Sequence, residues 1–153
     1  MDFVHVVAAS ALIDATDRHD GASERHEVAA INAALAEVLF WWRVLDDHLK
    51  SGRAAPVGLS QELGDVRPGL VWARNLATHH ALAVGRATYG RSYPRRYPLD
   101  YDERVTWRPL GDLPPPRGPA AWAAEQQAAY RAHLDGVRTA HSVDVIRRWA
   151  RAL

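Results

Sequence analysis

The stretch from Gly69 to Arg86 constrains the fold most, because it is apolar on almost every side and carries no strong helix breaker. Arg67 and Pro68 precede it, and the fixed φ of proline suits the first turn of a helix. At about 100° per residue, the apolar side chains leave no wide polar face. These side chains are Leu70, Val71, Trp72, Ala73, Leu76, Ala77, Ala81, Leu82, Ala83 and Val84. The pattern predicts a single, mostly buried helix over residues 69–86.

Four polar residues share one arc of this predicted helix. Arg74, Asn75, Thr78 and His79 fall within about 140° of one another at helical spacing. Polar groups on a buried helix cost stability unless they are paired, so this arc is a candidate functional site. The alternative is a core helix whose Arg74 and His79 simply reach the surface or cap neighbouring elements.

A second long helix is predicted from Ser23 to Lys50, with Ser23 as its N-cap. Its apolar residues recur at alternating spacings of three and four, which is typical of a helix packed lengthwise on other helices; they are Val28, Ile31, Leu35, Val38, Trp42 and Leu45. Asp46 lies on the same side as Trp42, and Glu37 flanks the apolar seam. A first helix is predicted over residues 2–18, ending at the His19, Asp20 and Gly21 run.

The segment from about residue 87 to 118 differs from the rest, because it holds too many prolines for a helix. Its tyrosines and Trp107 alternate with arginines, among them Arg91, Arg95 and Arg96. Such residues can stack bases and hold phosphates of single-stranded nucleic acid. They can equally cover a helical core, with arginines reaching water, and a long segment needs such packing to stay ordered. Residues 103–110 could form one strand of a short β-hairpin.

Two further helices are predicted over residues 120–135 and 142–152. The chain of 153 residues is therefore expected to form one all-α domain over 1–153, an up-and-down helical bundle with one irregular insertion. The helix that is too apolar for one face would lie at the centre of the bundle or form a second, intermolecular interface.

Composition excludes several classes of function. The chain has no cysteine, which excludes disulfides, a thiol nucleophile and a zinc–thiolate site. The formal net charge of +1 gives no overall basic field for nucleic acid. Adjacent His79 and His80 cannot both face one ion from a helix, and no His-Glu-x-x-His pattern occurs, so no metal or cofactor is expected. We expect no signal peptide, no membrane span and a cytoplasmic location.

The run Arg74-Asn75-Leu76-Ala77-Thr78-His79 resembles the motif of the HEPN superfamily, in which an arginine and a following polar residue precede a histidine. The resemblance implies an α-helical bundle and a metal-independent ribonuclease of the kind found in toxin–antitoxin and antiviral systems. It implies a homodimer that joins two motifs into one composite site, with Arg74 and His79 catalytic and Asn75 supporting. Residues 43–48 match the same spacing, but Val44 follows that arginine and the helix there has a good polar face.

The chemistry of such a site needs no metal. A histidine can remove the proton of a ribose 2′-hydroxyl or protonate the leaving oxygen, and a guanidinium can hold the phosphate. Thr78 lies on the same arc, and Asp46 or Glu37 on the second helix could supply a supporting carboxylate. RNA, a second copy of the chain and a cognate antitoxin are the expected partners. The alternatives are a helical interaction protein without catalysis and a binder of single-stranded nucleic acid that uses the insertion.

Overall fold

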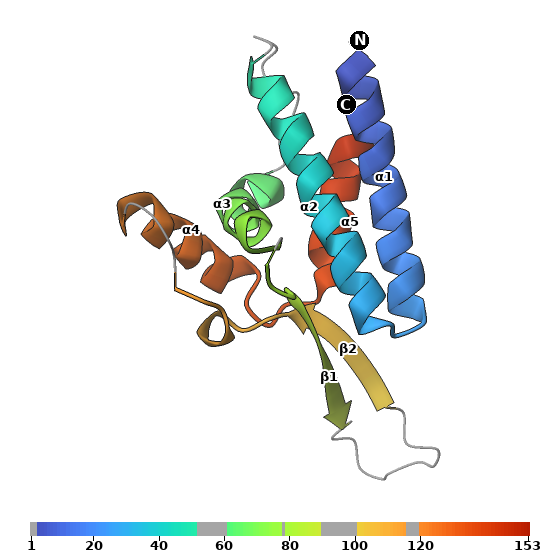
Figure 1. Cartoon of the computed structure of the whole chain (residues 1–153), viewed down its shortest axis with the longest axis vertical. Coiled ribbons are helices and arrows are strands. Elements are labelled where there is room, and N and C mark those ends of the chain that lie inside the picture. The colour runs from blue at the N-terminus through green and yellow to red at the C-terminus, as the bar shows by residue number, and fades with distance from the viewer. Residues whose placement is uncertain (1–2, 52–60, 78, 90–100, 116–119) are drawn as a thin grey trace.

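A computed structural model describes residues 3–51, 61–77, 79–89, 101–115 and 120–153 (Figure 1). The described chain is an all-α helical bundle with one small antiparallel sheet. Its elements are α1 (Phe3–Glu24), α2 (Val28–Ser51), α3 (Gln61–Ala77), β1 (Ala83–Tyr89), β2 (Tyr101–Trp107), a 3-10 turn η1 (Leu110–Asp112), α4 (Ala120–His133) and α5 (Thr139–Arg151). The predicted fold class is confirmed.

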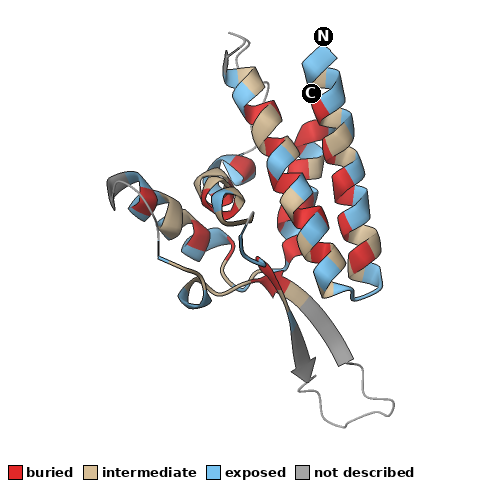
Figure 2. Ribbon diagram, viewed as in Figure 1, coloured by how far each residue is buried: buried red, intermediate tan, exposed pale blue. Residues whose placement is uncertain are grey.

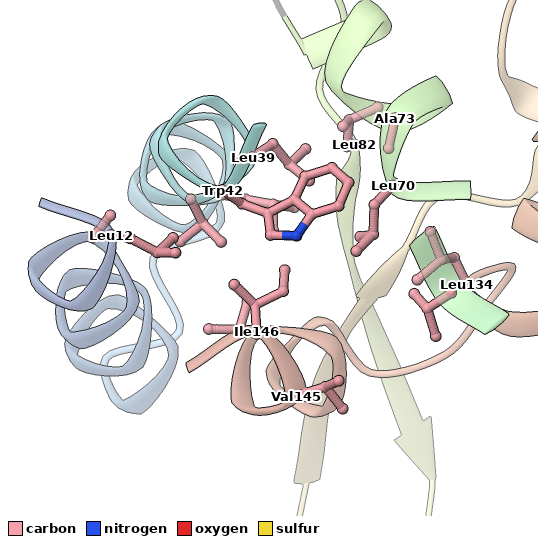
Figure 3. Close-up of a cluster of buried hydrophobic side chains, with 14 of the residues drawn as sticks. Leu12, Leu39, Trp42, Leu70, Ala73, Leu82, Leu134, Val145 and Ile146 are labelled. Carbon is pink, nitrogen blue, oxygen red and sulfur yellow. The ribbon is translucent and has the colours of Figure 1, made fainter. Parts of the chain in front are cut away.

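Helices α1, α2 and α5 form one side of the molecule, and α3 and α4 form the other (Figure 1). The predicted seam of α2 is buried at every position except its first, and Trp42 lies at its centre with no exposed surface. Figure 3 shows Trp42 between Leu12 of α1, Ile146 of α5 and Leu70 of α3. One continuous apolar core therefore joins both sides of the molecule.

Helix α1 extends to Glu24, beyond the predicted end at residue 18. Ser23 therefore lies in the last turn of α1 and is not the N-cap of α2. His19 does not end the helix; it is fully buried, and its Nε2 lies 3.0 Å from Thr139 Oγ1 of α5. Arg147 of α5 donates to Thr16 Oγ1 at 2.9 Å and to the Thr16 carbonyl at 3.0 Å, and it also pairs with Asp20. This polar network holds α5 against the extra turns of α1. The turn between α1 and α2 lies at His26, whose φ is 55°.

The prediction of one helix over residues 69–86 is wrong at both ends. Helix α3 begins at Gln61, so Pro68 lies inside it, and it ends at Ala77. Residues from Ala83 onward form β1, which pairs with β2 in the register Gly85↔Val105. The hairpin prediction is thereby confirmed, with its second strand at Tyr101–Trp107 instead of residues 103–110.

Two contacts distant in sequence favour the strand over the helix. The side-chain amide of Asn32 on α2 donates to the Ala83 carbonyl at 3.0 Å and accepts from the Ala83 N–H at 2.8 Å. It thus pairs with both backbone groups of one residue, as a neighbouring strand would. The Arg108 N–H donates to the Leu82 carbonyl at 2.7 Å. Leu82, directly before β1, and Ala83, its first residue, are both buried in the core.

Helix α2 also bears on the expectation of no membrane span. By length and composition alone, residues 28–50 are long and apolar enough to cross a membrane, contrary to that expectation. In the structure α2 packs against α1, α3 and α5, and its buried positions belong to the common core. The core helix of a bundle has the same composition as a membrane span, so this is weak evidence for a membrane.

Gly69 sets the distance between α3 and α4. A Cβ atom at Gly69 would lie 2.9 Å from the backbone nitrogen of Tyr130, whereas one at Gly64 of the same helix would meet nothing within 4 Å. Gly64→Ala should raise stability by about 0.5–1 kcal/mol through helix propensity. Gly69→Ala should lower it by about 1–3 kcal/mol, because the two helices must separate. Urea unfolding of both variants checks this, and two variants of equal stability would show that the helices do not cross so closely.

Burial of His19 predicts a dependence of stability on pH. Burial lowers the pKa of His19 below its usual 6.5, against the smaller opposing effect of Asp20. The unfolded chain therefore binds a proton before the folded chain does, and stability should fall as pH drops below 6.5. Above that pH both forms are neutral at this residue and it contributes no slope. Between pH 7.5 and pH 5, the melting temperature of His19→Gln should fall by less than that of the parent. If both melting temperatures fall equally with pH, His19 is not the group responsible.

Candidate functional site

Arg74 and Asn75 lie on the last turns of α3, as the arc predicted. Arg74 is half-buried, Asn75 is exposed, and the Arg74 Nη1 donates to Asn75 Oδ1 at 3.5 Å. Hydrogen bonds of that length are weak, so the guanidinium keeps donors for another group. Thr78 lies outside the described residues.

His79 follows α3 and is not part of a longer helix, which corrects the predicted arc. The N–H groups of His79 and His80 both donate to the Leu76 carbonyl at 2.9 Å. This shared acceptor closes the C-terminus of α3 and fixes both backbones at its end. Both side chains are exposed, and their ring centroids lie 6.5 Å apart at an interplanar angle of 75°.

The two histidines line one hollow of about 450 Å³ between the end of α3 and α4. Its volume is in the range of small-molecule sites, about 300–1,000 Å³. The polar groups are those of Asn75, His79 and His80, and the walls are aromatic and proline rings. The lining residues are Trp72, Asn75, Leu76, His79, His80, Pro114, Pro115 and Trp122. Arg74 is outside this lining but touches it through Asn75.

His80 and Trp122 were not predicted as site residues. A helix through Gly69–Arg86 would turn His80 about 100° away from His79, so the helix assignment concealed the pair. Trp122 is 39% exposed and lines the hollow. A single tryptophan three positions after Pro119 carries no signal of a site in the sequence.

Tyr130 of α4 fixes the wall of the hollow from behind. Its ring packs edge-on against Trp72, with centroids 4.9 Å apart, and against Trp107, with centroids 6.1 Å apart. Its hydroxyl donates to the Arg108 carbonyl at 2.8 Å, and burial raises the pKa of this phenol. Figure 2 shows the buried ends of both strands meeting the helices here.

Trp107 does not contact solvent and is corrected as a candidate RNA contact. It is fully buried, and its Nε1 donates to Ser142 Oγ at 3.0 Å. The packing role predicted for this residue is confirmed. Arg91, Arg95 and Arg96 lie outside the described residues.

Asp46 is a structural residue and does not line the hollow. Its carboxylate is buried and accepts from Arg67 Nε and Nη2, both at 3.0 Å. Lys50 lies 2.9 Å and Arg43 3.5 Å from the same group. The pair with Arg67 joins α2 to α3, and the other two lie within α2. The suggested supporting role of Asp46 is therefore not what the geometry favours.

Glu37 lies on the opposite side of α2, where it pairs with Arg18 of α1. It lines a groove between these two helices and is not near the hollow. No cluster of three or more potential metal ligands occurs among the described residues. The described part of the chain thus brings together Arg74, Asn75 and His79, and leaves both suggested carboxylates elsewhere.

Comparison of the chain with protein-family models, with curated proteins and with solved structures gave no match.

Substitution of two neighbouring aspartates tests the structural role of Asp46. Asp46→Ala should lower the free energy of unfolding by about 1.5–3 kcal/mol, because the Arg67 guanidinium loses a bidentate partner. Asp47→Ala should cost less than about 1 kcal/mol, since Asp47 forms an exposed pair with Arg43. Denaturant unfolding of both variants measures the difference. An Asp46→Ala protein of parental stability would show that the ion pairs around this carboxylate contribute nothing.

Proposed function

We propose that the protein is a metal-independent endoribonuclease that cleaves RNA in the hollow at the end of α3. The observation that carries this proposal is the pair His79 and His80 on one concave surface, which Asn75 also lines and which Arg74 reaches through its hydrogen bond to Asn75. Histidine is the side chain that most readily gives and takes protons near neutral pH. Two of them at one site supply a base and an acid without a metal.

The reaction would proceed by transfer within the RNA backbone. One histidine takes the proton of a ribose 2′-hydroxyl, and the 2′-oxygen attacks the adjacent phosphorus. The bond from phosphorus to the 5′-oxygen breaks, and the other histidine donates a proton to that oxygen. The products are a 2′,3′-cyclic phosphate and a 5′-hydroxyl. Ring centroids 6.5 Å apart allow one phosphodiester within hydrogen-bond reach of both rings, about 2.6–3.2 Å.

Arg74 would hold the charge that develops on the phosphate. Among the described residues its guanidinium donates to the neutral amide of Asn75, and guanidinium groups bind phosphate through paired N–H donors. Trp122 is 39% exposed in the lining of the hollow and would stack on an unpaired base next to the cleaved bond. These features favour single-stranded RNA over a duplex.

The wider proposal follows the resemblance of Arg74-Asn75-x3-His79 to the HEPN motif. It places the protein among cytoplasmic toxins or antiviral ribonucleases that a cognate antitoxin or other partner restrains. A composite site made by two protomers would not be needed, because His79 and His80 of one protomer would supply both the acid and the base. The competing function is a helical interaction module without catalysis, in which the hollow binds a partner.

Cleavage of an RNA panel in the presence of EDTA tests the proposal. His79→Ala and His80→Ala should each lower the cleavage rate by about a hundred- to ten-thousand-fold, because each removes one proton-transfer group. Arg74→Ala should lower it by a similar factor through lost stabilisation of charge.

His133→Ala is the matched control, since His133 is exposed on α4 and is outside the lining of the hollow. It should cleave as the parent does, and circular dichroism should show all four variants folded. Activity that survives both His79→Ala and His80→Ala, or a folded parent that cleaves no RNA, would refute the enzyme and leave the interaction module.

A further inference from the structure

We propose that the hollow holds one base of the RNA and that this base is adenine, with Asn75 as the residue that determines the specificity. The inference rests on the proposed ribonuclease, because it names the substrate of the same site. His79 and His80 act on the phosphodiester, and other side chains of the lining hold a base beside it. Cleavage would then be restricted to bonds next to one type of nucleotide.

Aromatic and proline rings in the lining suit the flat face of a base. Trp72 is buried and packs edge-on against Tyr130, so it holds a fixed position in the wall. Trp122 is exposed and keeps ring surface for a ligand, and Pro114 and Pro115 line the same hollow. Stacking on an aromatic ring accepts every base, but a larger ring system buries more apolar surface. These groups therefore favour a purine.

Asn75 can form hydrogen bonds with the edge of such a base. Among the described lining residues other than the two histidines, it alone carries both a donor and an acceptor. It is exposed, and its Oδ1 accepts one weak hydrogen bond, from Arg74 Nη1 at 3.5 Å. A carbonyl oxygen has two lone pairs, so Oδ1 can accept again, and Nδ2 has two N–H donors. The amide can therefore form a pair of hydrogen bonds with a ligand.

Adenine is the purine whose edge matches this amide. It presents the N6 amino group beside the N7 acceptor, and a side-chain amide binds these two groups together. Guanine presents O6 beside N7 at the same place, and both are acceptors, so the oxygen of the amide would face an acceptor. Cytosine has an amino group beside a ring nitrogen but offers a smaller ring for stacking. Adenine is thus the base that satisfies both the rings and the amide.

The hydrogen bond from Arg74 to Asn75 connects base binding to the phosphate. The guanidinium that would hold the phosphate of the cleaved bond contacts the amide that would bind the base. A base that pairs with Asn75 thus sets its own phosphate beside Arg74 and near the two histidines, and such positioning accelerates a reaction. Asn75 is therefore a specificity-determining residue and transfers no proton.

Titration calorimetry with 5′-mononucleotides measures the base preference without any cleavage. The parent should bind AMP about five times more tightly than GMP, because a matched pair of hydrogen bonds discriminates against a wrong base. 7-Deaza-AMP, which lacks the N7 acceptor, should bind more weakly than AMP. Trp122→Ala should weaken the binding of every nucleotide and leave their order unchanged.

Asn75→Asp should invert the order of AMP and GMP. A carboxylate only accepts hydrogen bonds, so it opposes adenine N7 and accepts from the N1–H and N2–H groups of guanine. Gln61→Glu is the matched control, because it adds the same negative charge at the exposed first residue of α3, outside the lining of the hollow. It should keep the parental order.

Cleavage of uridine-rich RNAs that carry a single adenosine or guanosine distinguishes this proposal from the ribonuclease itself. The cut should lie next to the adenosine. Preference for AMP without any cleavage would support the base site and refute the enzyme, whereas cleavage next to all nucleotides alike would refute the base site and leave the enzyme. A parent that binds no mononucleotide, that binds GMP or 7-deaza-AMP as tightly as AMP, or whose order survives Asn75→Asp, would overturn the proposal.

Discussion

The position of Tyr130 is the constraint on which both the two-sided fold and the hollow depend. Its backbone lies directly against Gly69, which brings α3 and α4 closer than any larger residue would allow. Its ring separates Trp72 from Trp107, and its hydroxyl binds the Arg108 carbonyl after β2. One residue thus contacts the helix that precedes the histidines, belongs to the helix that supplies the opposite wall, and binds the chain directly after β2. Edge-on aromatic contacts of this kind define an orientation as well as a buried area.

The sequence was sufficient to predict the helices that bury one face, and insufficient where a distant residue decided the structure. The seam of α2 shows in its spacing, because every turn buries the same side. The strand at Ala83 does not, because its apolar residues also fit a helix and its partner amide on Asn32 comes from another element. His19 and Asp20 look like a helix end until Arg147 of α5 is placed beside them. Such choices are made by tertiary contacts, which override local preference.

Only part of the candidate site could be predicted, because tertiary contacts bring the rest of its residues together. Asn75 and His79 were found because a polar group in an apolar stretch needs an explanation. His80 and Trp122 were missed because only the true end of α3 and the crossing of α4 bring them to the same hollow. Asp46 was suggested for its inward position, which is real, but its cationic neighbours explain it fully as a link between helices.

We propose that two histidines at the end of one helix cleave RNA by proton transfer alone. The most direct measurement is the chemical identity of the new ends of an RNA cut by the purified protein in EDTA, determined by mass spectrometry. The account predicts a 2′,3′-cyclic phosphate on one fragment and a 5′-hydroxyl on the other, since the 2′-oxygen is the attacking atom and no water enters that step. Fragments with 5′-phosphates and free 3′-hydroxyls, or cleavage that EDTA abolishes, would contradict it.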